Sequence, residues 1–157
     1  MAIANPYNYS KPSNFHKVKV NPRVQPAKKR DDSESKSDPY LEQKVMSASP
    51  QQLTLMLYEG AIRFLKLSRI HMESGKVEES NLNLTKAQRI INELNITLDA
   101  QYDVSKNLSS LYEFMLRRIS EAMVQRSTEH IDEVIELIDD LRGTWKDATK
   151  SMPGAQG

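Results

Sequence analysis

Apolar side chains recur at intervals of three and four residues along most of the chain after residue 49. This spacing is typical of amphipathic α-helices that bury one face. It predicts four helices, over about residues 50–74, 76–100, 105–125 and 128–149. Helices of this kind, joined by short turns, pack best as an antiparallel up-down bundle. The expected fold class is therefore all-α, with four helices in one bundle.

Local signals mark where these helices begin and end. Ser49, Pro50 and Gln52 together predict an N-cap, a proline in the first turn and a capping box. Gly75 predicts the left-handed residue that ends the first helix. The other expected caps are Asp103 or Ser105 for the third helix, and Ser127 with Thr128 for the fourth.

The first helix is apolar on more than one side, whereas a bundle helix needs only one apolar stripe. The second stripe is therefore either buried by another neighbour or lines a groove that receives a partner's helix. We assign to the core Leu53, Met56, Leu57, Phe64 and Leu67. We assign to the groove Leu55, Tyr58, Ile62 and Leu65.

Further groove candidates come from the second and third helices. They are Leu82, Ile91, Leu94, Leu98, Leu108 and Leu111. The last five also fit the core, because they lie on the apolar stripes of their own helices. Leu82, Ile96 and Phe114 are instead expected to point away from the core. Trp145 falls on the core face of the fourth helix.

The first 39 residues differ from the rest in composition. They contain five of the seven prolines and few large apolar side chains, so they cannot bury enough surface to order themselves. They carry eight Lys or Arg and four Asp or Glu, a net charge of +4 in a chain of net charge +1. We expect a disordered basic tail at residues 1–39, a helical domain at 40–150 and a flexible C-terminus at 151–157.

The residues show no pattern of a catalytic or metal site. The chain has no cysteine, its three histidines lack partners at ligand spacing, and its five glycines form no phosphate-binding loop. We therefore expect no enzyme activity, no metal and no cofactor. The near-neutral charge argues against nucleic-acid binding. Without a signal-peptide pattern or an apolar run of about 18 residues, a cytoplasmic protein with no membrane insertion is favoured.

Four segments, in order along the chain, carry more specific motifs. They are MSASPQQLTLMLYEGAIRFL at 46–65, KAQRIINEL at 86–94, NLSSLYEFM at 107–115 and LRGTWKDA at 141–148. Together they resemble the FliS family of flagellin-specific export chaperones, over a range from about Tyr40 to Ala148. The chain departs from that family in a long insertion between Tyr7 and Tyr40.

This resemblance implies a helical-bundle chaperone that binds the disordered C-terminal region of flagellin in the cytoplasm and blocks its premature assembly. It also implies delivery of the complex to the export gate, whose membrane component is FlhA. The flagellin-binding residues would be the groove candidates above. The N-terminal cap over the groove would be Tyr7 with Tyr9 or Tyr40 with Leu41, and we favour Tyr40 and Leu41 because they lie just ahead of the first long helix. From the residues alone, the alternative is an adaptor that binds a different amphipathic helix.

Overall fold

The structure is a computed structural model and describes residues 38–150. Within this range it contains five helices: α1 Pro39–Ser47, α2 Pro50–Glu73, α3 Val77–Ile96, α4 Asp103–Gln125 and α5 Thr128–Lys150. Four of them match the predicted helices, whereas the sequence did not predict α1. The tail at residues 1–37 and the C-terminus at 151–157 lie outside the described residues, so the predicted domain boundaries remain predictions.

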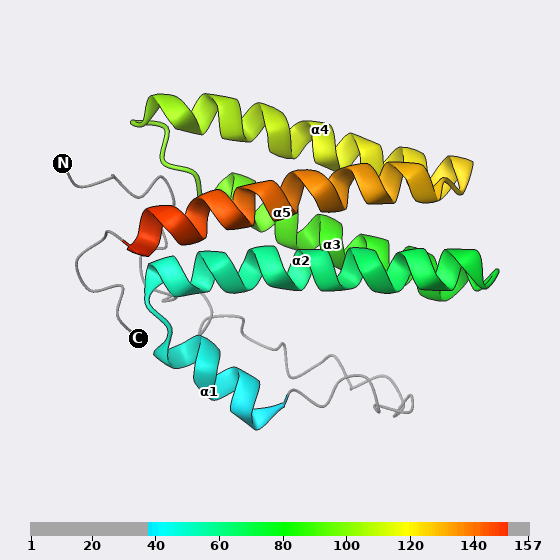
Figure 1. Ribbon diagram of the computed structural model, residues 1–157, viewed down its shortest axis with the longest axis horizontal. Helices are drawn as coiled ribbons and strands as arrows, with labels where there is room; N and C mark the ends of the chain where they lie inside the picture. The colour runs from blue at the N-terminus through cyan, green and yellow to red at the C-terminus, as the bar shows by residue number, and fades with distance from the viewer. Residues whose placement is uncertain (1–37, 151–157) are drawn as a thin grey trace, which may run out of the picture. The chain divides into compact units, whose positions relative to one another are not determined.

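Helices α2 to α5 form an antiparallel bundle, in which each helix runs opposite to the one before it (Figure 1). Helix α2 packs against α3 and α5, and α4 packs against the same two helices. These neighbours confirm the all-α fold class and the up-down order of the four long helices. Helix α1 belongs to a different compact unit from the bundle.

One stripe from each long helix forms the core, as the three- and four-residue spacing predicts. The hydroxyl groups of Tyr58 and Tyr112 lie 2.6 Å apart inside it, which joins α2 to α4 across the bundle. The fully buried apolar side chains of α3, α4 and α5 are Leu84, Ala87, Ile91, Leu94, Tyr112, Met115, Ile119, Ala122, Ile131, Val134 and Ile138.

Small residues allow α2 and α3 to approach each other closely. Ser68 and Ser80 are both buried. The Ser68 hydroxyl donates to the Ser80 carbonyl at 3.0 Å, and the Ser80 hydroxyl donates to the Ser68 carbonyl at 3.1 Å. At Gly60, an added Cβ would lie 3.4 Å from Cδ1 of Ile90. The reciprocal serine bonds and the lack of a side chain at Gly60 therefore bring the two backbones close together.

The predicted ends of α2 are confirmed. The Ser49 hydroxyl accepts a hydrogen bond from the Gln52 amide at 3.2 Å, and the Gln52 side chain accepts one from the Ser49 amide at 2.9 Å. Gly75 has a φ of 74°, in the left-handed region that favours glycine. Ser127 also caps α5 as predicted, because its hydroxyl accepts a hydrogen bond from the His130 amide at 3.3 Å.

Two predicted boundaries in the turn between α3 and α4 are wrong. Helix α3 ends at Ile96 instead of extending to residue 100. Directly after this end, the Thr97 hydroxyl donates to the carbonyls of Glu93 and Leu94 at 3.0 and 3.1 Å. Such side-chain bonds compete with continuation of the helix. Neither Asp103 nor Ser105 is the cap of α4, since the N-cap residue is Tyr102, with no side-chain hydrogen bond to the helix. Ser105 is buried inside α4 and donates to the carbonyl of Asp99.

Candidate functional site

The two apolar stripes of α2 have exchanged their predicted positions, so that the predicted groove stripe lies in the core and the predicted core stripe lies nearer the surface. Tyr58, Ile62 and Leu65, which we assigned to a groove, are buried in the bundle. Because α2 contacts both α3 and α5, this stripe faces the core between them, which is the alternative that the sequence left open. The assignment of the other stripe to the core is wrong: Leu53, Met56, Leu57 and Phe64 are partly exposed and Leu67 is 39% exposed.

The predicted groove residues are divided between the core and the surface. Ile91 and Leu94 of α3 are fully buried, like Tyr58 and Leu65 of α2. These four side chains can contact a partner only if the bundle opens. The remaining candidates that are at least partly exposed are Leu55, Leu82, Leu98, Leu108 and Leu111. Leu82 at 46% and Ile96 at 68% exposure point away from the core, as predicted.

The partly exposed stripe of α2 carries a basic-aromatic cluster beside α3. The guanidinium of Arg63 lies 5.2 Å from the centroid of the Phe64 ring, and the ammonium of Lys86 lies 5.4 Å from it. Cations at this distance are attracted to the face of an aromatic ring. The cluster holds Phe64 at the surface between two long, charged side chains.

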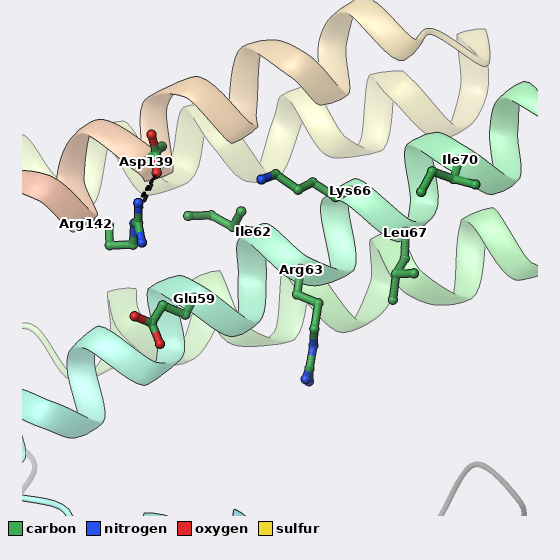
Figure 2. A pocket seen from close by; sticks show the side chains of 8 residues that line it. All are labelled: Glu59, Ile62, Arg63, Lys66, Leu67, Ile70, Asp139 and Arg142. Carbon is green, nitrogen blue, oxygen red and sulfur yellow. Dashed lines mark hydrogen bonds and ion pairs between the residues drawn. The ribbon is translucent and has the colours of Figure 1, made fainter.

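A shallow groove of about 370 Å³ follows the outer side of α2 and reaches α5 (Figure 2). Ile62 lies in it with 9% exposure, and Leu67 and Ile70 add apolar surface at 39% and 56% exposure. Lys66 extends from α2 toward α5, whereas Arg63 points to the opposite side of α2 (Figure 2). The other lining residues are Glu59, Asp139 and Arg142.

Ile62 was predicted to line a groove, whereas Leu67 and Ile70 were not predicted as groove residues. The signal was available for Ile70, because residues 59, 63, 66 and 70 recur at the helical spacing of one face. It was masked by the charges at three of these four positions, which are typical of a solvated face. The groove is therefore lined by both apolar and charged side chains.

Ion pairs join the helices around this surface. Arg142 contacts Asp139 at 2.8 Å within α5, and Arg69 of α2 contacts Asp132 of α5 at 2.7 Å. Between α4 and α5, Arg118 contacts Glu133 at 3.1 Å. A hydrogen bond from Arg118 to Glu121 raises the pKa of the Arg118 guanidinium. Such exposed pairs contribute little stability each.

Trp145 is buried at the end of the bundle where α5 meets the start of α2. Its indole N–H donates to the Gln51 carbonyl at 3.0 Å. This contact confirms the predicted core position of the only tryptophan in the chain. Because Gln51 lies in the first turn of α2, this hydrogen bond joins the start of α2 to α5.

Helix α1 carries the two predicted cap residues in its first turn. The Asp38 side chain accepts a hydrogen bond from the Tyr40 amide at 3.0 Å, which begins the helix. Tyr40 and Leu41 are exposed, as are Val45 and Met46. Their assignment as a cap over a groove remains a prediction.

Features of other kinds of site are not found in the described part of the chain. Within residues 38–150, no group of three or more His, Asp or Glu side chains is placed to hold a metal ion. In the same range, no helix is long and apolar enough to span a membrane.

Comparisons with known proteins identify the family. The family model described as "Flagellar protein FliS" matches residues 33–152. The flagellar secretion chaperone FliS of Bacillus subtilis (strain 168) is 38% identical over 112 residues, which cover 71% of this chain and 84% of that protein. The protein of the same name from Salmonella typhimurium is 38% identical over 109 residues, covering 68% and 81%.

A solved structure shows that the fold is shared as well. A crystal structure described as a flagellar chaperone from bacteria superposes with a TM-score of 0.61 and 23% identity, covering 71% of this chain and 95% of its own. The predicted resemblance is thus confirmed over the bundle. A chaperone family is not a class of enzymes. This chain belongs to the FliS family of flagellar secretion chaperones.

Proposed function

We propose that this protein is a cytoplasmic export chaperone for flagellin, which binds the disordered C-terminal region of its client and prevents premature polymerisation. The complex would then be delivered to the export gate through its membrane component FlhA. Family membership supports the role in flagellar export. The choice of flagellin and FlhA as partners is our inference from the family resemblance.

One structural observation carries the proposal: α2 has an apolar stripe at the surface in addition to the stripe that completes the core. The core stripe already packs against α3 and α5. The outer stripe lies beside α3, where the ammonium of Lys86 is 5.4 Å from the centroid of the Phe64 ring, and it leaves Leu53, Leu57 and Phe64 partly exposed. A folded domain with spare apolar surface on a long helix suits a partner that supplies an amphipathic helix.

We propose that the client contacts the predicted groove residues that reach the surface, together with this outer stripe. Ile62 contributes from the floor of the α2 groove. For the buried candidates Tyr58, Leu65, Ile91 and Leu94, a role in binding requires a bound form in which the helices move apart. The predicted residues that need no such change are Leu55, Leu82, Leu98, Leu108 and Leu111.

A disordered segment suits this shallow surface. Folding on binding lets a short chain cover a large area of a small domain, although ordering it consumes about 2–5 kcal/mol of the interaction free energy. The apolar contacts would appear as a negative heat-capacity change. These properties match a chaperone that holds one client and releases it at the gate.

Isothermal titration calorimetry tests the proposal directly. The full chain is titrated with a peptide that covers the C-terminal region of flagellin from the same cells, at several temperatures. We expect saturable one-to-one binding with a negative heat-capacity change. If no heat of binding appears at any temperature, the protein has a different helical partner, and the adaptor interpretation replaces this one.

A further inference from the structure

Helix α1 is a short helix whose apolar side chains are open to water. None of its 9 residues is buried. Tyr40 is 74% exposed, Leu41 43% and Val45 41%. A helix shorter than about 12 residues is marginal in water by itself, so a helix of this length depends on a contact that covers its apolar side. That contact has to come from outside α1.

The apolar side chains of α1 share one side of the helix. At about 100° per residue, Tyr40, Leu41 and Val45 fall within about 140° of one another, and Lys44 lies among them. The stem of a lysine can lie along an apolar surface while its ammonium stays in water. Met46, although exposed, falls on the opposite side. This pattern suits a surface that is apolar in its interior and anionic at its boundary.

The sequence ahead of α1 is strongly basic. Residues 1–30 contain no Asp or Glu, and their seven Lys or Arg all lie in residues 11–30, the basic segment. Eight residues, 31–38, separate this segment from α1, and four of them are acidic. Eight extended residues span about 26 Å. The basic segment and α1 can therefore reach one surface while the acidic residues between them stay in water.

From these features we infer that α1 and the basic segment together bind an anionic lipid surface, with the apolar side of α1 in the headgroup region. One weak apolar anchor holds a protein on a membrane only marginally, whereas an apolar anchor and a basic patch together bind stably. A tyrosine suits this boundary because its ring is apolar and its hydroxyl is polar. The phosphates of a nucleic acid would match the charge, but they offer no apolar surface to Leu41 and Val45.

This inference goes beyond the proposed function, because it names a lipid partner on a segment other than the bundle. Lipid binding would hold the chaperone at the membrane that contains the proposed export gate. Tyr40 and Leu41 cannot contact lipid and cover a client groove at the same time. Lipid binding would therefore also remove the predicted cap from the groove.

Sedimentation with lipid vesicles tests the inference on the full chain. One set of vesicles is pure phosphatidylcholine, and the other contains equal parts of phosphatidylcholine and phosphatidylglycerol. We expect binding to the anionic set only, and we expect it to weaken as salt is added because salt screens the charges. Binding to neither set, or equal binding to both, would overturn the inference.

A matched pair of triple variants tests the basic segment. Replacing Lys28, Lys29 and Arg30 by glutamine should weaken binding to the anionic vesicles at least tenfold, because each basic residue near such a surface strengthens binding about fivefold. The control removes the same charge from the bundle and should change the affinity less than about twofold, because salt screens distant charges. Its three exposed lysines are Lys106, Lys146 and Lys150. Equal losses in the two variants would overturn the inference.

Substitutions in α1 test the apolar contact. Replacing both Leu41 and Val45 by glutamine should weaken binding to the anionic vesicles about tenfold, whereas Met46→Gln on the opposite side should have little effect. Circular dichroism should show an intact bundle in both variants, because α1 has no buried residue. An unchanged affinity of the double variant would overturn the inference. Tighter binding of the chain to double-stranded DNA than to the anionic vesicles would also overturn it.

Calorimetry with the flagellin C-terminal peptide keeps this inference separate from the proposed function. A chain that binds the peptide but no vesicles retains the proposed function and refutes the lipid contact. A chain that binds anionic vesicles but not the peptide retains the lipid contact and refutes flagellin as the client. We expect both to bind.

Discussion

Individual buried residues at the contact between α2 and α3 set how closely these helices pack. Ser68 is fully buried and its hydroxyl bonds to the Ser80 carbonyl at 3.0 Å. Ser68→Ala should lower the free energy of unfolding by about 1 kcal/mol through loss of this bond. Ser68→Val should cost more, about 2–3 kcal/mol, because it adds volume where two helices already touch.

Urea unfolding followed by the fluorescence of Trp145, the only tryptophan, measures both changes. Ser110→Ala on the exposed surface of α4 is the matched control and should leave the unfolding midpoint nearly unchanged. A Ser68→Val variant as stable as the original would show that α2 and α3 are not tightly packed here.

At the scale of a helix, the start of α2 depends on reciprocal hydrogen bonds between Ser49 and Gln52. Ser49→Ala removes one of them and should lower the free energy of unfolding by about 1 kcal/mol. Ser49→Asp should keep most of the stability, since an aspartate can accept the same bond. Urea unfolding of the two variants provides the comparison, and equal losses would contradict a capping role.

Helix α1 offers a second test at this scale. If Tyr40 and Leu41 cover the groove in the free chaperone, they compete with the client. Replacing both by alanine should then tighten binding of the flagellin peptide by about twofold or more, because a larger fraction of the protein is ready to bind. Calorimetry measures the change. Unchanged or weaker binding would show that the pair is not a competing cap.

At the scale of the whole molecule, substitution of one isoleucine should destabilise the fold, whereas substitution of another should weaken client binding alone. Ile138 is fully buried in α5, so Ile138→Asp places an unpaired charge in the core and should unfold the bundle. Ile70 is 56% exposed, so Ile70→Asp should keep the helical content and weaken binding of the client. Circular dichroism and calorimetry of both variants check this. Similar unfolding of the two would mean that Ile70 is part of the packing.

The sequence by itself determined the existence of the four long helices and most of their ends. The three- and four-residue spacing is a local property of the chain, and caps such as Ser49, Gly75 and Ser127 act on the nearest backbone groups. Helix α1 and the early end of α3 escaped prediction. Asp38 followed by Pro39 is the same kind of start signal as Ser49 followed by Pro50, but it lies at the edge of a segment whose composition favours disorder. The hydrogen bonds of the Thr97 hydroxyl have no strong signature in the sequence.

Only the tertiary structure decided which apolar stripe of α2 is core and which is surface. Periodicity shows that Tyr58 and Phe64 lie on different faces, but it contains no information about where α3 and α5 stand around the helix. That choice follows from packing between residues far apart in sequence, such as Tyr58 with Tyr112 and Gln51 with Trp145. The groove between α2 and α5 exists only after the helices have come together.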